Sequence, residues 1–293
     1  MPHRLSGSKA AFVSRLSVLC VAIATSGCAS FWLLYPGMAR SHDPHLDPQA
    51  SGHSYQIVSV TNGQGFKLVG WLFSNPSDRG TALIAGGNAQ DISSTYSVSR
   101  YLIGNGFRIL NFTYQGFDTN EGDSELTSLE GDARAFYLFA QNRFPGEPIA
   151  FVGYSLGAVT GICLADTETL NAVVAEGSFN PKTIVEDKHL WIAMPLSGMF
   201  SSSVPDELDT SRCLSQLQSV PIMFLHGQED PLAPYDSARR LYEGYQGPKQ
   251  FVETHPAVGA DAHYGSVSDP EARAKVLAFL KQHLLPAETS VPR

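Results

Sequence analysis

Short apolar segments alternate with longer segments of helical periodicity along most of this chain. Strand-like segments occur at residues 55–60, 67–73, 81–85, 107–112, 149–153, 172–176, 221–227 and 250–254. Helical patterns occur at 91–103, 126–142, 155–165, 237–245 and 270–284. Strands that alternate with helices form parallel sheets covered on both faces, so the pattern predicts an α/β fold with a mostly parallel eight-stranded sheet. Asn62-Gly63, between the first two strands, predicts an antiparallel hairpin at the edge.

The length of the chain suits a single folded domain with short additions. It has 293 residues, of which 43% are hydrophobic, enough for one core built from residues 55–285. A signal segment is expected at 1–27 and a membrane-proximal linker at 28–54. A polar tail is expected at 286–293. Residues 178–219 interrupt the alternation between the sixth and seventh strands.

The first 27 residues have the composition of a targeting segment. Arg4, Lys9 and Arg15 precede an uncharged, mostly apolar run, and no acidic residue occurs before Cys28. Residues 25–28, Thr-Ser-Gly-Cys, resemble the lipobox of bacterial lipoproteins, with threonine in place of the usual leucine. The resemblance implies cleavage before Cys28 and lipidation of that cysteine. The mature chain would then be tethered in the cell envelope, facing the periplasm or the cell exterior.

Two other interpretations of this segment stay open. Residues 16–39 carry no charge, and an uncleaved segment of that length spans a bilayer. The excess of basic residues on its amino-terminal side would keep that end in the cytoplasm. The third interpretation is a free secreted protein. The lipoprotein and the uncleaved anchor both tether the domain to a membrane outside the cytoplasm.

The charge balance excludes some partners. Without the three bases of the targeting segment, 17 basic residues face 28 acidic ones. An acidic surface disfavours nucleic acid and electrostatic docking on anionic lipid. The expected membrane contact is therefore the lipidated amino terminus or the anchor.

Possible metal ligands are confined to the linker. His42, Asp43, His45 and Asp47 lie close together in sequence, but the prolines among them prevent a regular helix that would gather them. A solvated linker is expected there. No C-x-x-C or zinc spacing and no nucleotide motif occurs, so neither a metal nor a cofactor is expected.

Two cysteines fall inside the predicted domain. Cys163 and Cys213 could pair in an oxidising compartment. The helical context of Cys163 favours the other interpretation, in which it packs as a small apolar residue.

Residues 149–164, IAFVGYSLGAVTGICL, place one serine between two glycines in an otherwise apolar stretch. A strand before Gly153 and a helix after Gly157 put Ser155 at the carboxyl end of a parallel strand, where such sheets bind ligands. A sharp strand-to-helix turn would present the hydroxyl above the sheet, and the helix amino terminus favours developing negative charge. Ser155 is therefore predicted to be a nucleophile. The alternative is a helix cap among glycines that only permit close packing.

A serine nucleophile needs a base and an acid that orients the base. In FLHGQEDPLAP, Asp230 follows the seventh strand, and in GADAHYGS, His263 follows the last strand. The order Ser155, Asp230, His263 is the one expected after a nucleophile elbow. Glu229 is the nearest rival acid, and position favours Asp230.

Other acids and histidines near these motifs are interpreted differently. Asp261 is only two residues from His263, too close for the usual geometry. His226 and His255 end strands and are interpreted as structural.

The oxyanion of an acyl-transfer reaction needs two hydrogen-bond donors. The backbone N–H of Leu156, directly after the serine, is one candidate. The loop LIAGGNAQD after the third strand should supply the second, and the backbone N–H of Asn88 is the candidate, with Ala89 as its neighbour. The alternative is a glycine turn without such a role.

Taken together, these motifs resemble the alpha/beta-hydrolase superfamily over residues 55–285. Within it they are most similar to the short-lidded serine hydrolases. This group includes serine-aminopeptidase-like esterases and depalmitoylase-like thioesterases. Its oxyanion loop reads H-G-N-A, and the corresponding residues here are 86–89, GGNA. The next strand of this group usually ends in Y-R-G-x-G-x-S-x-G, here residues 114–122, YQGFDTNEG. Residues 226–230, HGQED, match the H-G-x-x-D acid loop. Two departures are Gly86 for the loop histidine and Gln115 for the arginine.

The resemblance implies that residues 178–219 form a lid. Its segment HLWIAMPLSGMF is apolar and aromatic. The residues expected to line an acyl pocket are Trp191, Met194, Leu196, Met199 and Phe200. The alternative is that they bury the underside of the lid against the core. An apolar lid favours a small or lipid-like substrate with an apolar acyl chain.

The leading hypothesis is a serine hydrolase of the esterase or thioesterase type (EC 3.1) that acts through an acyl-enzyme. An acyltransferase or a peptidase on the same triad is the second. A non-catalytic envelope binding module that keeps the scaffold is the third. Neither the substrate nor the oligomeric state follows from the sequence.

Overall fold

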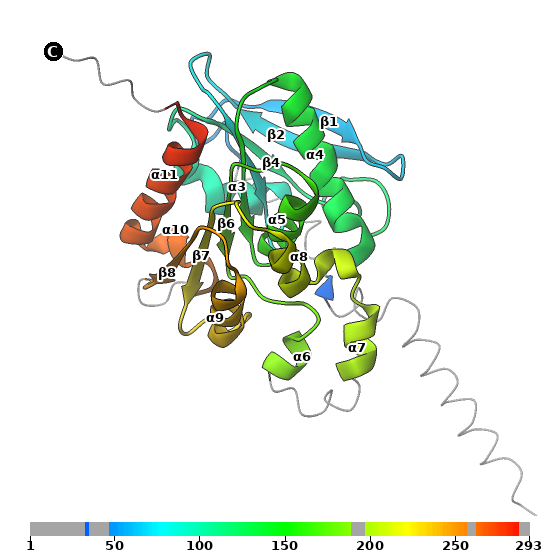
Figure 1. Ribbon diagram of the computed structural model, residues 1–293. Coiled ribbons are helices and arrows are strands. Elements are labelled where there is room, and N and C mark those ends of the chain that lie inside the picture. Colours follow the sequence, from blue (N-terminus) through cyan, green and yellow to red (C-terminus); the bar gives the residue numbers. More distant parts are fainter. Residues whose placement is uncertain (1–32, 35–46, 189–196, 257–261, 287–293) are drawn as a thin grey trace, which may run out of the picture.

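The computed structural model describes residues 33–34, 47–188, 197–256 and 262–286. Eight strands form one sheet in the order β1-β2-β4-β3-β5-β6-β7-β8 (Figure 1). The strands are β1 Gln56–Thr61, β2 Lys67–Phe73, β3 Thr81–Ala85, β4 Arg108–Phe112, β5 Ile149–Tyr154, β6 Ala172–Glu176, β7 Ile222–Gly227 and β8 Lys249–Thr254. β1 and β2 form an antiparallel hairpin, and β2 is antiparallel to β4. All other pairs are parallel, which confirms the predicted fold class.

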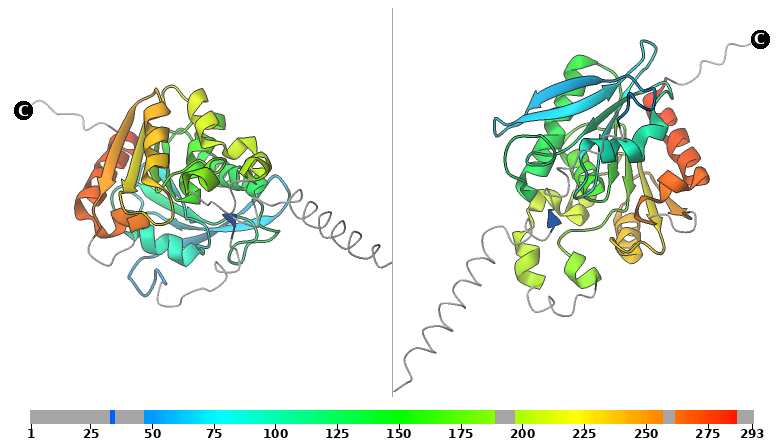
Figure 2. Two further views of the ribbon diagram at one scale, coloured as in Figure 1. Left: turned by 90° about the horizontal axis from the view of Figure 1, so that it is seen from below. Right: turned by 180° about the vertical axis from the view of Figure 1, so that it is seen from behind.

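Helices cover both faces of the sheet (Figures 1 and 2). The longer ones are α3 Ile92–Ser99, α4 Leu129–Arg143, α5 Leu156–Thr167, α9 Tyr235–Gly244 and α11 Pro270–Leu284. Alternate residues of β3 show the two layers: Leu83 belongs to the core that includes α4 and α5, and Ile84 to the core that includes α3 and α11. A strand buried on both faces must be apolar throughout, which explains why β3 and β5 are unbroken apolar runs.

Short helices fill the interval between β6 and β7, which the sequence pattern left unassigned. They are α6 Ile184–Asp187, α7 Ser197–Ser203, η6 Asp206–Leu208 and α8 Thr210–Gln216. The chain returns after β8 through η7 Ala262–Tyr264 and α10 Gly265–Ser268. Two further 3-10 turns replace parts of predicted helices. They are η3 Arg100–Leu102, near the end of the helix predicted at 91–103, and η4 Leu126–Ser128, at the start of the helix predicted at 126–142. Segments this short lack the repeated apolar spacing by which a helix is recognised.

The predicted linker contacts the domain at two described points. Leu34 is buried and belongs to the core that includes α5. Nδ1 of His53 lies 2.8 Å from the hydroxyl of Tyr96 on α3. The signal segment, Cys28, and the linker residues His42, Asp43 and His45 lie outside the described residues. Among the residues that are described, no helix has the length and apolarity to cross a bilayer.

Cys163 and Cys213 are joined by a disulfide, which corrects the expectation that Cys163 only packs as an apolar residue. Both sulfurs are buried, so the two interpretations are compatible: Cys163 packs in the core and is also bonded. The bridge joins α5, the helix that follows Ser155, to α8, the last helix before β7. Their Cα atoms are 5.1 Å apart although the residues are 50 positions apart in sequence.

Replacing both cysteines by alanine is expected to lower the free energy of unfolding by about 2–4 kcal/mol, because the unfolded chain regains the entropy of a long loop. For a domain of this size the melting temperature should fall by roughly 5–15 °C. Calorimetry of the parent and the double variant measures the difference. A double variant that melts with the parent would show that the bridge does not form.

Candidate active site

Ser155 occupies a sharp turn between β5 and α5. Its φ of 54° and ψ of −115° are unusual for a residue with a side chain. Such backbone strain costs about 1–3 kcal/mol and persists where surrounding contacts enforce it. The enforcing contacts are visible: the backbone N–H of Ser155 donates to the carbonyl of Glu176 at 2.8 Å. A methyl group at Gly153 would collide with the carbonyl of Gly157, and one at Gly157 with the carbonyl of Ala85.

Asp230 and His263 form a buried hydrogen-bonded pair. Nδ1 of His263 lies 2.7 Å from Oδ2 of Asp230, and both side chains are at most 1% exposed. The other carboxylate oxygen accepts the backbone N–H groups of Leu232 at 2.7 Å and Ala233 at 2.9 Å. Burial alone would raise the pKa of Asp230. Hydrogen bonds from His226 and His263 outweigh burial and hold that pKa well below its usual value. Asp230 is therefore an anion at neutral pH and orients the His263 ring.

The rival residues lie elsewhere or support the pair. Glu229 is exposed, as expected if only one of two adjacent acids faces inward. His255 is also exposed, whereas Asp261 lies outside the described residues. His226 is fully buried, with Nε2 3.2 Å from Oδ2 of Asp230 and 3.0 Å from the carbonyl of Ala233. The interpretation of His226 as structural thus missed that it holds the acid.

The end of β6 brings the histidine and the serine to the same place. Gly177 has a φ of 65°, and a methyl group there would lie 2.8 Å from Cε1 and 3.0 Å from Nδ1 of His263. The ring of His263 therefore packs directly on the backbone that follows Glu176. Because the carbonyl of Glu176 holds Ser155, both residues are anchored to two consecutive positions of the chain.

The loop after β3 also lies against the serine. A methyl group at Gly87 would lie 3.0 Å from Cβ of Ser155 and 2.9 Å from the hydroxyl of Tyr264. Ala89 has a φ of 64°, so the loop turns sharply after Asn88. Leu156 begins α5 on the other side of the serine. The two predicted oxyanion donors, Asn88 and Leu156, thus belong to the segments that flank Ser155.

No family model matches the chain, but comparison with known proteins finds relatives. It is 30% identical over 209 residues to the uncharacterized protein Rv2307c of Mycobacterium tuberculosis, covering 69% of this chain and 71% of that protein. It is 24% identical over 188 residues to human alpha/beta hydrolase domain-containing protein 17B, covering 59% and 58% of the two chains. The solved esterase Pf2001 of Pyrococcus furiosus superposes with a TM-score of 0.67 at 18% identity, covering 84% and 96%. The chain belongs to the alpha/beta-hydrolase superfamily.

The departure of this alpha/beta hydrolase at Gly86 has a structural reason. A methyl group there would collide with Oγ1 of Thr95 and lie 2.8 Å from Oε1 of Gln90, so a histidine does not fit. Oε1 of Gln90 instead accepts the backbone N–H of Gly87 at 2.5 Å. Gln90 thereby fixes the loop from within. In the sequence, the one signal of this role is the polar residue directly after the loop motif.

The second departure, Gln115, belongs to a buried hydrogen-bonded network with Asn62 and Asp132. Its side-chain oxygen accepts from Nδ2 of Asn62 at 2.8 Å, and its backbone N–H donates to Asp132 at 2.8 Å. Nδ2 of Asn62 also donates to Asp132 at 2.7 Å. Burial raises the pKa of Asp132 to about 6, against hydrogen bonds that lower it. A glutamine suits such a site, because it joins the network without adding a charge that needs a partner.

The predicted acyl-pocket residues are only partly described. Trp191, Met194 and Leu196 lie outside the described residues. Met199 and Phe200 lie on α7, where Met199 is 39% exposed and Phe200 is buried in the core beneath α5. Their role in a pocket stays a prediction.

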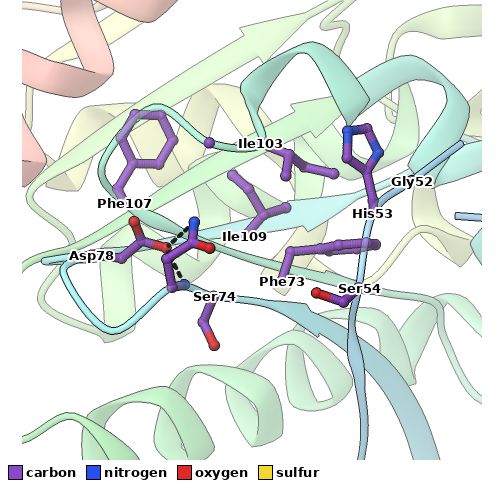
Figure 3. Close-up of a pocket in the computed structure, with 11 residues that line it drawn as sticks. Gly52, His53, Ser54, Phe73, Ser74, Asp78, Ile103, Phe107 and Ile109 are labelled. Atoms are coloured by element: carbon purple, nitrogen blue, oxygen red, sulfur yellow. Dashed lines mark hydrogen bonds between the residues drawn. The ribbon is translucent and has the colours of Figure 1, made fainter. Parts of the chain in front are cut away.

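A separate crevice of about 240 Å³ lies at the other end of the sheet (Figure 3). Phe73 ends β2 beside Ile109 at the start of β4, and His53 and Asp78 complete its wall. Since Ser155 follows the carboxyl end of β5, this crevice is remote from the serine. Asp78 there accepts the backbone N–H of Asn75 at 2.6 Å, a contact that closes a turn.

Proposed function

We propose that the protein is a serine hydrolase of carboxylic esters or thioesters with apolar acyl chains. The observation that carries the proposal is the buried His263–Asp230 pair, packed at the end of β6 that also holds the strained Ser155. This is the arrangement by which a base and its orienting acid activate a serine hydroxyl. The likeness of the fold to an esterase supports the reaction class.

In the proposed reaction, Oγ of Ser155 attacks the acyl carbon as Nε2 of His263 takes its proton. The oxyanion is held by the backbone N–H groups of Asn88 and Leu156. Collapse of the intermediate expels the alcohol or thiol, which takes the proton from His263, and leaves an acyl-serine. Water then attacks the acyl-serine, His263 removes its proton, and the free acid departs as Ser155 regains a proton.

The test of the substrate class uses purified protein and matched chromogenic compounds. Acetyl, butyryl and octanoyl esters of p-nitrophenol are compared with leucine p-nitroanilide, with and without added ethanol. We expect turnover of the esters, fastest for the longer acyl chains, and free acid as the product. Preferential cleavage of the anilide would favour a peptidase, and ethyl ester as the main product would favour an acyltransferase. Either result would overturn the proposal.

We also propose that the chain is exported and tethered to a membrane through Cys28. The bases and apolar run of the targeting segment support this, and so does the disulfide, since such bonds persist in oxidising compartments. Fractionation of a bacterial host that expresses the full chain tests the proposal. The parent should incorporate a labelled fatty acid and Cys28→Ala should not, and a parent that stays in the membrane without incorporating the label would argue for the uncleaved anchor.

A further inference from the structure

Glu176 is a buried acid that the proposed reaction does not use. It ends β6, between Tyr154 of β5 and Leu225 of β7, and is 2% exposed. Its carboxylate binds one residue twice: Oε1 accepts the backbone N–H of Ser266 at 2.7 Å, and Oε2 accepts the Ser266 hydroxyl. A buried charged side chain is retained only where such bonds compensate for its desolvation.

Ser266 lies on α10, three residues after His263. Glu176 therefore clamps the segment that carries the catalytic base, while its own carbonyl holds the N–H of Ser155. The neighbouring Gly177 completes the arrangement, because its bare backbone supports the ring of His263. A single strand end thus fixes the relative position of nucleophile and base.

The charged groups that act on Glu176 include His226 and Asp230. Burial raises its pKa to about 7, hydrogen bonds from Ser266 and the electrostatic interaction with His226 lower it, and the negative charge of Asp230 raises it. The carboxyl thus changes its charge in the range where a catalytic histidine works. The titratable groups that interact with it or with its tyrosine neighbours are His226, Asp230, Tyr101, Tyr154 and Arg273.

We propose that Glu176 is a positioning residue of the active site that, as a carboxylate, holds the segment of His263 in place through Ser266. The inference rests on the proposed function. An ionised carboxylate accepts both bonds from Ser266 more strongly than a neutral carboxyl does, so the clamp weakens when Glu176 gains a proton. The rate at which Ser155 is activated should therefore follow the charge of Glu176.

The experiment measures the second-order rate of Ser155 labelling by a fluorophosphonate as a function of pH, in the parent and in Glu176→Gln. Glutamine keeps the shape and accepts the Ser266 N–H but carries no charge. We expect the maximal rate to fall by about 3- to 10-fold, because a neutral amide holds Ser266 less tightly than a carboxylate does. The acid limb should begin at lower pH, because glutamine removes the ionisation near pH 7 that weakens the clamp in the parent. A purely structural role would lower the rate without moving the limb.

Two further variants keep the test decisive. Ser266→Ala removes one hydrogen bond to the ionised carboxyl, so Glu176 is neutral up to a higher pH and the acid limb should move to higher pH, opposite to the shift in Glu176→Gln. It decides the question if Glu176→Gln does not fold. Asp132→Asn is the matched control, a buried carboxyl with a raised pKa in a different network, and it should leave the limb in place.

The outcomes separate the two proposals. A folded parent that is never labelled at any pH overturns the proposed function, and the inference about Glu176 falls with it. If the parent is labelled, and the acid limbs of Glu176→Gln and Ser266→Ala both coincide with that of the parent, only the inference about Glu176 is overturned.

Discussion

Ser155→Ala is expected to abolish labelling by a fluorophosphonate and to reduce ester hydrolysis by about 10⁴- to 10⁶-fold, the range found when a triad nucleophile is removed. Alanine lacks the hydroxyl group of Ser155, which is the proposed nucleophile. The fold should persist, because the neighbouring contacts that enforce the turn are made by backbone atoms and glycines. In-gel fluorescence and ester turnover measure the two effects.

The matched control is Ser99→Ala. Ser99 is fully buried on α3, on the face of the sheet opposite α5. Its hydroxyl donates to the carbonyl of Thr95 at 2.8 Å. This variant should label and hydrolyse like the parent. Labelling of Ser155→Ala at the parental rate would place the reactive group elsewhere. No labelling of the folded parent would favour the non-catalytic binding module.

The fold could be predicted because each of its strands is marked locally. β3, β5 and β6 are short apolar runs bounded by glycine or polar residues, and their alternation with helices admits few other architectures. The order of strands within the sheet does not follow from the pattern in the same way. β3 lies between β4 and β5, an arrangement set by how the helices pack and not by any residue within the strand.

The residues of the candidate site also fall into two groups, those that a sequence motif marks and those that are recognised only in the structure. Ser155, Asp230 and His263 are recognisable because each stands in a motif after a strand, and the carboxyl ends of parallel strands meet at one edge. Gln90 and His226 support that site through contacts with Gly87 and Asp230, which are near in sequence but lie in loops that follow no regular spacing. Glu176 supports it through contacts made only in the fold. Glu176 and Ser266 are 90 positions apart in sequence, and no spacing rule connects them.

The disulfide shows the same limit. Cys163 and Cys213 are two cysteines in one domain, and whether they meet depends on how the chain between β6 and β7 returns to α5. The short helices in that interval carry no strong periodicity. Tertiary geometry therefore settles what composition leaves open.

Asp230→Asn is expected to lower ester hydrolysis and the labelling rate by about 10³- to 10⁴-fold. Asparagine cannot be the anion that His263 needs, and its amide favours the wrong tautomer of the ring. The pKa of Asp230 is held well below its usual value, so the parent carboxylate is ionised throughout the neutral range. The defect should therefore be similar at pH values from about 6 to 9, unlike the shift expected for Glu176→Gln.

Glu229→Gln is the natural control, because it removes the same charge from the adjacent, exposed residue. It should change the rate by less than about twofold, as expected for a solvated carboxylate outside the site. Thermal melting of Asp230→Asn separates a catalytic defect from unfolding, since the loss of its bonds to His226 and His263 also removes stability. If Glu229→Gln shows the larger loss in rate, the orienting acid is Glu229, and the hydrogen bond of 2.7 Å between His263 and Asp230 serves only the fold.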